Sequence, residues 1–336
     1  MWRVYRRKEK RGKTRRRRRR RRRLVAMQLG IIGLGKMGGN LALQANEKKI
    51  AVIGKARSNK PELEKHGIKV VNDYKIFVDF LKHPRVVYLS LPAGPTVDSV
   101  LNELVPFLQE GDVLMDGGNS FYLDSVEREK KISEKGIYFL DCGTSGGLEG
   151  ARHGACFMVG GKEEGIRIAE PILTALAVKD GYIYTGRPGT GHFVKLVHNG
   201  IEFGMLQSIG EGVELLSRSG FELDLAAIFK NWSNGSVIRG WLVELMEKGL
   251  REQGLAKTES YIEDTGEVNW LVQDAINKEI PIPVISQSIM ELFKSRMNGS
   301  NTYRSIALMR HGFGGHPFGK DEGIIEERKT SRISKV

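Results

Sequence analysis

The sequence predicts an α/β doubly wound domain followed by an all-α helical domain. From residue 27 to about residue 184, short apolar runs alternate with helical patterns, which is typical of a mainly parallel sheet covered by helices on both faces. After Gly191 the helical periodicity continues, while strand signals nearly vanish. The 336 residues are enough for two domains of about 150 residues each.

The elements follow from the apolar patterns in chain order. Strands are predicted at 28–32, 50–53, 86–91, 113–115, 137–140, 156–159 and 182–184. Helices are predicted between them at 37–47, 60–66, 74–81, 96–108, 122–135 and 163–176. The second part is predicted to form helices at 193–219, 223–231, 238–248, 270–277 and 283–296. The stretch 320–336 is polar and is expected to be loose.

The net charge of +13 comes from the first 26 residues. They contain 16 Lys/Arg, nine of them in the unbroken run 15–23, and one acid, which leaves 37 basic and 39 acidic residues in 27–336. The folded part is therefore not a nucleic-acid-binding surface by composition. A run of arginines repels itself and has no apolar face, so 1–26 is expected to be disordered.

Three interpretations of this basic segment were compared. We favour an upstream extension of a protein that naturally begins at Met27. Binding of RNA or anionic lipid through counterion release is the alternative. A secretory signal with its apolar part at 24–35 is disfavoured, because no small-residue cleavage site follows.

Composition excludes several classes of protein. With 40% hydrophobic residues and two cysteines, the chain is neither wholly disordered nor a disulfide-built scaffold. No apolar stretch reaches roughly 18 residues, so we expect no membrane span. Cys142 and Cys156 are expected to be reduced thiols in a cytoplasmic protein.

A glycine pattern lies between the first predicted strand and the first predicted helix: Gly33-Leu34-Gly35-Lys36-Met37-Gly38. The first glycine permits a tight turn, the second lets the backbone approach a pyrophosphate, and the third lets the helix pack closely on the strand. The helix N-terminus would face the phosphates. The pattern predicts a Rossmann-type domain that binds a dinucleotide, the alternative being a glycine-rich turn without a ligand.

The end of the second predicted strand indicates which nicotinamide cofactor binds. An acid there hydrogen-bonds the ribose 2′-hydroxyl of NAD, whereas cations accommodate the 2′-phosphate of NADP. The segment Gly54-Lys55-Ala56-Arg57-Ser58 has no acid. We therefore expect NADP, with Arg57 on the adenine or the phosphate and Ser58 donating a hydrogen bond. NAD remains the alternative, as does a solvated loop without a role.

Polar and small residues gather in three further segments, at 116–120, 143–151 and 191–202. The first two follow predicted strands, at the rim where open sheets bind ligands. In the third, one helix face carries four side chains at helical spacing: Lys195, His198, Asn199 and Glu202. This face offers a base, two hydrogen-bonding groups and an acid, the base and acid roughly 10 Å apart. Gly200 is expected to permit close approach of a ligand or of backbone.

These segments carry the motifs G-N-S at 118–120, S-G-G-x-E-G-A at 145–151 and G-H-F-V-K-x-V-H-N-G-I-E at 191–202. On them the sequence resembles the 6-phosphogluconate dehydrogenases, decarboxylating enzymes of the pentose phosphate pathway and of gluconate utilisation, within the β-hydroxyacid dehydrogenase superfamily. The similarity runs from residue 27 to about residue 316. The length resembles the short form of the family.

The resemblance implies an NAD(P)-dependent dehydrogenase and two catalytic residues. Lys195 would be the base that takes the C3 hydroxyl proton as hydride leaves C3, and the resulting β-keto acid would lose CO₂. Glu202 would protonate the enol to give ribulose 5-phosphate. No metal is expected. The base must be neutral when it acts, so the pKa of Lys195 must be depressed by burial or neighbouring charge.

Sequence and resemblance together assign the binding residues. The predicted substrate-binding residues are Asn119, Ser145, Gly146, Gly147, His198, Asn199, Arg296, Arg310 and His316. The predicted cofactor-binding residues are Gly33, Leu34, Gly35, Lys36, Met37, Gly38, Arg57, Ser58, Leu91, Pro92, Ala93 and Asn119. Arg310 and His316 resemble family residues that reach the substrate of a neighbouring subunit, which implies a homodimer or homotetramer.

Three positions depart from the family's pattern. Ala56 replaces the asparagine of its N-R-T cofactor triplet. Phe203 replaces a tyrosine that helps to hold the 6-phosphate, and Asn269 stands in place of the lysine of G-T-G-K-W. Phosphate recognition is therefore expected to rest on Arg310, together with Arg296.

Two alternative functions remain. Another β-hydroxyacid dehydrogenase, acting on a small or unphosphorylated sugar acid, would suit Phe203 and Asn269, but the continuation 198–202 after Lys195 argues against it. An RNA-binding protein would work through the Arg-rich segment. The expected organisation is a disordered extension at 1–26, an NAD(P)-binding Rossmann domain at 27–188, a helical substrate and dimerisation domain at 189–318 and a polar tail at 319–336.

Overall fold

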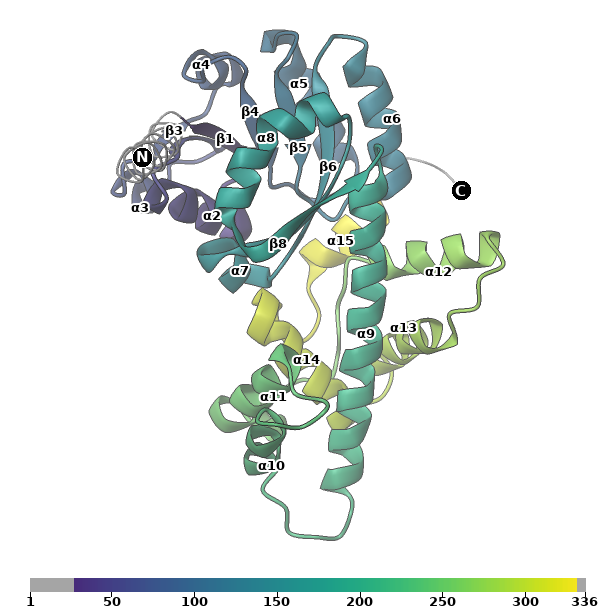
Figure 1. Cartoon of the computed structure of the whole chain (residues 1–336). Helices are drawn as coiled ribbons and strands as arrows, with labels where there is room; N and C mark the ends of the chain where they lie inside the picture. The colour runs from purple at the N-terminus through teal and green to yellow at the C-terminus, as the bar shows by residue number, and fades with distance from the viewer. Residues whose placement is uncertain (1–26, 331–336) are drawn as a thin grey trace, which may run out of the picture.

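The computed structural model describes residues 27–330, and the predictions for 1–26 and 331–336 lie outside the described residues. Figure 1 shows a sheet with its covering helices at one end, a group of helices at the other, and the long helix α9 (Thr190–Ser217) running between them. This arrangement confirms the predicted α/β domain followed by a helical one.

The sheet has eight strands in the order β3-β2-β1-β4-β5-β6-β7-β8. In chain order they are β1 (Gln28–Ile32), β2 (Ala51–Lys55), β3 (Lys69–Val71), β4 (Val86–Leu89), β5 (Val113–Asp116), β6 (Tyr138–Ser145), β7 (Ala155–Gly160) and β8 (Ala177–Gly186). All neighbouring pairs are parallel except β6 with β7. Because β1 lies between β2 and β4, the strand order reverses there, which is where open sheets of this kind bind ligands.

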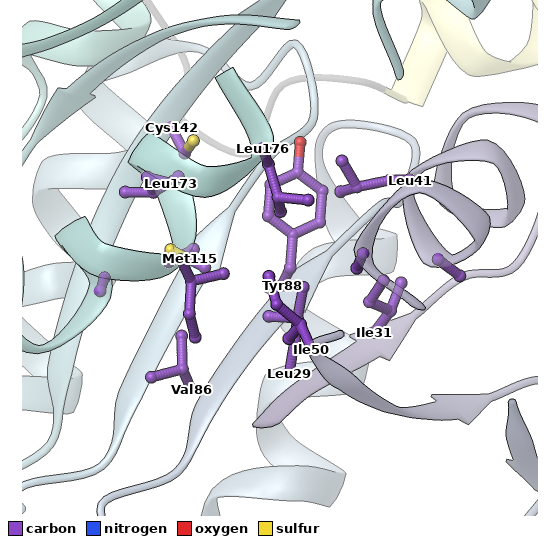
Figure 2. Close-up of a cluster of buried hydrophobic side chains, with 14 of the residues drawn as sticks. Leu29, Ile31, Leu41, Ile50, Val86, Tyr88, Met115, Cys142, Leu173 and Leu176 are labelled. Atoms are coloured by element: carbon purple, nitrogen blue, oxygen red, sulfur yellow. The ribbon is translucent and has the colours of Figure 1, made fainter. Parts of the chain in front are cut away.

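The helices of this part are α2 (Lys36–Glu47), α3 (Pro61–Glu64), α4 (Tyr74–Asp79), α5 (Pro95–Leu104) with the 3₁₀ turn η1 (Val105–Phe107), α6 (Tyr122–Ser133), α7 (Gly147–His153) and α8 (Glu163–Leu176). Figure 2 shows the core between the sheet and two of them, where Tyr88 of β4 lies near Leu41 of α2 and Leu176 of α8. A second cluster fills the opposite face beneath α4, α5 and α6. Strands buried on both faces explain the continuous apolar runs in the sequence.

The helices that follow α9 are α10 (Leu225–Trp232), α11 (Trp241–Glu252), the 3₁₀ turn η2 (Leu255–Lys257), α12 (Glu267–Asn277), α13 (Pro283–Ser295), α14 (Asn301–Gly314) and α15 (Glu322–Thr330). Their core is a separate apolar cluster built along α9, in which Phe203 and Leu206 pack with Met246 of α11 and Met309 of α14. Helix α9 thus belongs to both halves of the molecule, and its residues near the sheet face the ligand-binding edge.

Some elements differ from the prediction. The patterns do not predict β3, a three-residue strand at the sheet edge, α7, which starts within a glycine-rich segment, or α14. The expectation of a loose tail from residue 320 is wrong for Glu322–Thr330, which form α15. Arg328 of α15 pairs with the buried carboxylate of Glu263 and donates to the Asp264 carbonyl oxygen at 2.9 Å, which gives this polar segment a partner.

Among residues 27–330, no helix has the length and apolar character needed to cross a membrane. Both cysteines are free thiols, Cys142 buried in the sheet and Cys156 exposed.

Candidate active site

The glycine turn after β1 fits a dinucleotide phosphate. Gly33 has φ +91°, and a Cβ there would lie 2.2 Å from the Ser90 carbonyl oxygen. A Cβ on Gly38 would lie 2.0 Å from the Gly33 oxygen, so only glycine lets α2 pack this closely. At Gly35, by contrast, a Cβ would meet nothing within 4 Å, and α2 begins at the next residue. This open space before the N–H groups of a helix start is the cradle that a pyrophosphate needs, so these residues fit NAD or NADP.

A cavity of about 1650 Å³ opens at the carboxyl ends of the strands. The predicted site residues that line it are Gly35, Lys36, Met37, Leu91, Pro92, Ala93, Asn119, Ser145, Gly146, Gly147, Lys195, His198, Asn199, Glu202, Arg310 and His316. They come from the loops after β1, β4, β5 and β6 and from the segments around α9 and α14. The fold therefore brings the glycine turn, the polar rim and the polar face of α9 to one cavity.

The remaining predicted residues are not among those that line the cavity. They are Gly33, Leu34, Gly38, Arg57, Ser58 and Arg296. Arg57 and Ser58 are exposed just beyond β2. The Arg296 guanidinium lies 2.8 Å from the Asp264 carboxylate and 3.4 Å from that of Glu263, so the protein itself engages this cation. The structure does not bring Arg296 to the cavity.

A buried carboxylate on β6 fixes the start of α9. The Asp141 side chain accepts hydrogen bonds from the backbone N–H groups of Gly189 at 2.7 Å and His192 at 2.8 Å. A Cβ on Gly143 would lie 2.6 Å from the Cβ of Lys195, so this glycine lets α9 lie directly against the strand. Sequence reasoning did not single out Asp141, whose role depends on a contact between distant segments. The hydrogen bonds to Asp141 and the close contact at Gly143 together hold Lys195 at the rim of the sheet.

The Lys195 amine is held within a hydrogen-bonded group. Its side chain is buried, with 7% of the residue exposed. Its Nζ donates to Asn199 Oδ1 at 2.7 Å and lies 3.4 Å from His198 Nδ1. The other ring nitrogen of His198 lies 3.0 Å from Ser145 Oγ. Side chains from β6 and from two positions of α9 therefore fix the direction of the amine.

Burial shifts Lys195 and Glu202 towards their neutral forms. It lowers the pKa of Lys195, and the carboxylates of Glu202 and Glu267 oppose the shift. It raises the pKa of Glu202, against the charges of Lys195 and Arg310. Burial also lowers the pKa of His198, and the Lys195 charge adds to the effect. A neutral amine can accept a proton and a neutral carboxyl can donate one, so the pair suits acid–base work on one substrate.

Arg310 and His316 line the cavity of their own chain. The end of α14 reaches the start of α7, since a Cβ on Gly147 would lie 2.0 Å from the Phe313 carbonyl oxygen. The Arg310 guanidinium lies 5.4 Å from the ring centre of Phe203. Their reach towards a neighbouring subunit's substrate stays a prediction, as does the oligomeric state.

Sequence reasoning missed Glu267 and Thr265. Asn199 Nδ2 donates to Glu267 Oε1 at 3.5 Å, and the Thr265 hydroxyl donates to the other carboxylate oxygen. Both residues line the cavity, as do Ile324 and Glu327 of α15. Glu267 is 68 positions from Asn199, so no local spacing links them. The one available signal was an acid three residues before the predicted helix 270–277, within the segment that departs from G-T-G-K-W.

Gly200 serves helix packing. A Cβ there would lie 2.4 Å from Leu271 Cδ2 and 3.2 Å from two carbons of the Ile285 side chain. The expectation that Gly200 admits a ligand or backbone is therefore wrong, because side chains of α12 and α13 fill this space.

Comparison with known proteins identifies the family. Residues 28–186 match the model for the NAD binding domain of 6-phosphogluconate dehydrogenase, and residues 191–329 match that for its C-terminal domain. A relative from Haloferax volcanii, named 6-phosphogluconate dehydrogenase, NAD(+)-dependent, decarboxylating, is 39% identical over 86% of this chain and 98% of its own length. The chain belongs to the 6-phosphogluconate dehydrogenase family.

Other members of this family extend beyond the chain. A Bacillus subtilis relative, named as the NADP(+)-dependent, decarboxylating 6-phosphogluconate dehydrogenase, is 35% identical over 92% of this chain and 70% of its own length. The solved 6-phosphogluconate dehydrogenase of Plasmodium falciparum, described with NADP+ and with 6-phosphogluconate, superposes with a TM-score of 0.74 at 28% identity, over 80% of this chain and 62% of that one. A 3-hydroxyisobutyrate dehydrogenase from Salmonella typhimurium shares the fold, with a TM-score of 0.70 at 17% identity over 83% of this chain and 99% of that one.

Two departures from the family's pattern occupy different surroundings. Phe203, in place of the tyrosine, is buried and lines the cavity. Asn269, in place of the lysine, is not among the lining residues. Its Oδ1 is buried without a hydrogen-bond partner among the described residues. Neither position offers a cation to the cavity.

Proposed function

We propose that this protein catalyses the oxidative decarboxylation of 6-phospho-D-gluconate to ribulose 5-phosphate and CO₂, with reduction of NADP or NAD. One observation carries the proposal: a buried lysine with a lowered pKa and a partly buried glutamic acid with a raised pKa line the same cavity as the dinucleotide turn. Base, acid and cofactor are what this reaction requires. The names of the family members support the choice of substrate.

In the first step, neutral Lys195 takes the proton of the C3 hydroxyl. A dinucleotide held at the glycine turn by Gly33, Gly35 and Gly38 would supply the acceptor for the hydride that leaves C3. Asn199 Oδ1, at 2.7 Å from the amine, holds an N–H bond of Lys195 and so directs the nitrogen lone pair elsewhere. The C3–OH group becomes a ketone, and Lys195 becomes an ammonium.

In the second step, the bond from the carboxyl carbon to C2 breaks, and its electron pair moves towards the C3 oxygen. The Lys195 ammonium returns its proton to that oxygen as CO₂ leaves, so that an enol forms. Glu202, whose pKa is raised by burial, then donates a proton to the carbon that lost CO₂. Lys195 takes the enol hydroxyl proton back as the C=O bond re-forms, which gives ribulose 5-phosphate, and solvent then restores the proton states of both side chains.

The polar rim would hold the sugar acid. Asn119 and Ser145 offer an amide and a hydroxyl for the carboxylate and hydroxyls. Gly147 is the first residue of α7, whose N-terminal N–H groups favour an anion. Arg310 is the buried cation proposed for the 6-phosphate. Arg296 is not assigned to it, because Asp264 and Glu263 already neutralise this guanidinium.

We infer a preference for NADP from the residues that follow β2. Lys55 Nζ lies 4.0 Å from the ring centre of Tyr74, whereas Arg57 is exposed. Arg57→Ala should therefore raise the KM for NADP about 10-fold, the effect of roughly one lost charge-assisted hydrogen bond, and change the KM for NAD little. Initial rates with each cofactor measure this, and Lys60→Ala is the control. Equal effects on both cofactors would show that Arg57 does not contact the 2′-phosphate.

The assay for the function is spectrophotometric. Purified protein receives 6-phosphogluconate or gluconate, each with NADP or NAD, while NAD(P)H absorbance and CO₂ release are followed together. We expect one CO₂ for each NAD(P)H with 6-phosphogluconate, and slow turnover of gluconate. Faster turnover of gluconate would favour the second candidate, a β-hydroxyacid dehydrogenase for unphosphorylated acids, which Phe203 and Asn269 support. NAD(P)H without CO₂ would reject decarboxylation.

We further propose a cytoplasmic homodimer or homotetramer working in the pentose phosphate pathway. Exposed apolar side chains on α9 and α13 support an oligomer: Ile201, Met205, Leu215, Val284 and Met290. Light scattering on purified protein gives the subunit number.

A further inference from the structure

We propose that Glu267 is a positioning residue for this reaction: its carboxylate fixes the side-chain amide of Asn199, and this amide in turn directs the amine of Lys195. The inference rests on the proposed function, in which Lys195 is the base. Glu267 lies at the start of α12, on the opposite side of Asn199 from Lys195.

The contacts form a chain of four side chains. The Thr265 hydroxyl donates to Glu267 Oε2. Glu267 Oε1 accepts from Asn199 Nδ2 at 3.5 Å. Asn199 Oδ1 accepts from Lys195 Nζ at 2.7 Å. Glu267 and Asn199 are 9% and 5% exposed, so water competes little for these bonds.

The direction of each bond follows from the chemistry of the groups. An amide has a donor end and an acceptor end, and a carboxylate only accepts. Glu267 therefore selects the NH₂ end of Asn199 and leaves the carbonyl end for the amine of Lys195. Without the carboxylate, the amide of Asn199 can turn, and its NH₂ group could then donate to the lone pair of the neutral amine. The amine would lose the acceptor that sets its direction.

The backbone around Glu267 is built to hold it in this place. Gly266 precedes α12 with φ +82°, and a Cβ there would lie 3.0 Å from the Arg328 side chain and 3.3 Å from Asn269. Glu267 is the first residue of α12, where the helix dipole favours a negative charge. Leu271, one turn further along α12, fills the space beside Gly200 of α9. The carboxylate is thus fixed relative to the helix that carries Lys195.

The charge of Glu267 acts on Lys195 as well. The groups that influence Glu267 come from every neighbouring element: Lys195 on α9, Asp264 before α12, Arg310 on α14 and Glu327 on α15. Burial raises the pKa of Glu267, and Asp264 adds to the shift. The Glu267 carboxylate in turn raises the pKa of Lys195, against the larger effect of burial. Removing this charge should therefore lower the pKa of Lys195 further.

Two variants separate direction from charge. Glu267→Ala removes the acceptor, and we expect kcat to fall about 10- to 100-fold, the loss of roughly one hydrogen bond to a charged group. Glu267→Gln keeps an acceptor for Asn199 Nδ2 and should recover most of kcat. Because it lacks the charge, the acidic limb of its kcat/KM profile, where Lys195 becomes protonated, should move to lower pH. The KM for NADP should stay within about twofold in both variants.

The matched control is Asp274→Asn, an acid on the same helix whose partners are Tyr122 and Lys278. It should leave kcat and the acidic limb unchanged. The inference is overturned if wild-type enzyme turns over 6-phosphogluconate and Glu267→Ala keeps kcat within twofold. Should Glu267→Ala lose cofactor binding and thus its fold, Glu267→Gln decides, and an unmoved acidic limb overturns the inference. Wild-type protein without turnover would reject the proposed function instead.

Discussion

The chemistry of a single residue, Lys195, decides how the site can work. An amine at its ordinary pKa is charged at neutral pH and cannot take a proton. Burial lowers the pKa of Lys195, while the charges of Glu202 and Glu267 raise it and so oppose this effect. The site thus balances two opposing effects, and each of the three side chains is needed for that balance.

Removing this amine should abolish turnover while leaving the cofactor site intact. Lys195→Ala is expected to lower kcat by about 10³-fold, the usual size of a general-base contribution. NADPH fluorescence titration should give an unchanged Kd, because the glycine turn is built by other segments. Lys179→Ala, whose side chain is 93% exposed, is the control. A kcat within tenfold of wild type would remove Lys195 as the base.

His316 should make stability depend on pH. Burial and the Arg310 charge lower its pKa to about 3, whereas an unfolded histidine keeps its ordinary value near 6.5. Between these values the unfolded state binds more protons, so the free energy of unfolding falls as pH falls. From pH 7 to pH 5 the loss due to this group is about 2 kcal/mol.

Urea unfolding at the two pH values checks this number. His316→Gln should lose about 2 kcal/mol less than wild type over the same interval. The exposed His153→Gln should behave like wild type. An identical pH dependence of wild type and His316→Gln would mean that His316 binds its proton normally in the folded state.

At the scale of elements, periodic segments could be predicted and short ones could not. The prediction at 163–176 coincides with α8, because the apolar face of this helix is regular. Pro171 inside the helix does not end it. Strand β3 has three residues and one neighbour in the sheet, so its sequence is too short to show the alternation of apolar and polar residues that indicates a strand. Helix α7 starts after Gly146, which has φ +114°. In the sequence, the glycines of this segment indicate a loop, so the helix was not predicted. Helix α15 depends on Arg328 meeting Glu263, a contact that no local pattern contains.

The link between α13 and the segment before α12 gives a prediction at this scale. Arg296→Ala removes a cation from the buried Asp264, with Arg328 3.6 Å away as the remaining one. We expect a loss of about 1–3 kcal/mol in the free energy of unfolding and little change in the KM for the sugar acid. Arg310→Ala should instead raise that KM. Chemical denaturation and initial rates measure both, and a raised KM for Arg296→Ala would return this residue to the substrate site.

Across the whole molecule, the candidate site could be predicted in part. Lys195, His198, Asn199 and Glu202 share a face by helical spacing alone, which is local information. The place of Arg310 at the cavity of its own chain could not be inferred, because it depends on how the end of α14 packs near α7. Glu267 was missed for the same physical reason: its contact with Asn199 exists only once α12 packs on α9.

The distribution of charge gives the last prediction. Residues 1–26 hold 16 of the 53 Lys/Arg, and 27–336 are close to neutral, with 37 basic and 39 acidic residues. All the candidate site residues lie in 27–336. A protein beginning at Met27 should therefore keep kcat and both KM values within about twofold. It should also lose any affinity for RNA that the full chain has, since that affinity would come from phosphate neutralisation. Paired rate assays and RNA titrations at two salt concentrations test both halves. A large fall in kcat would mean that the basic segment takes part in catalysis, and RNA binding retained by the shorter protein would locate a nucleic-acid surface on the folded part.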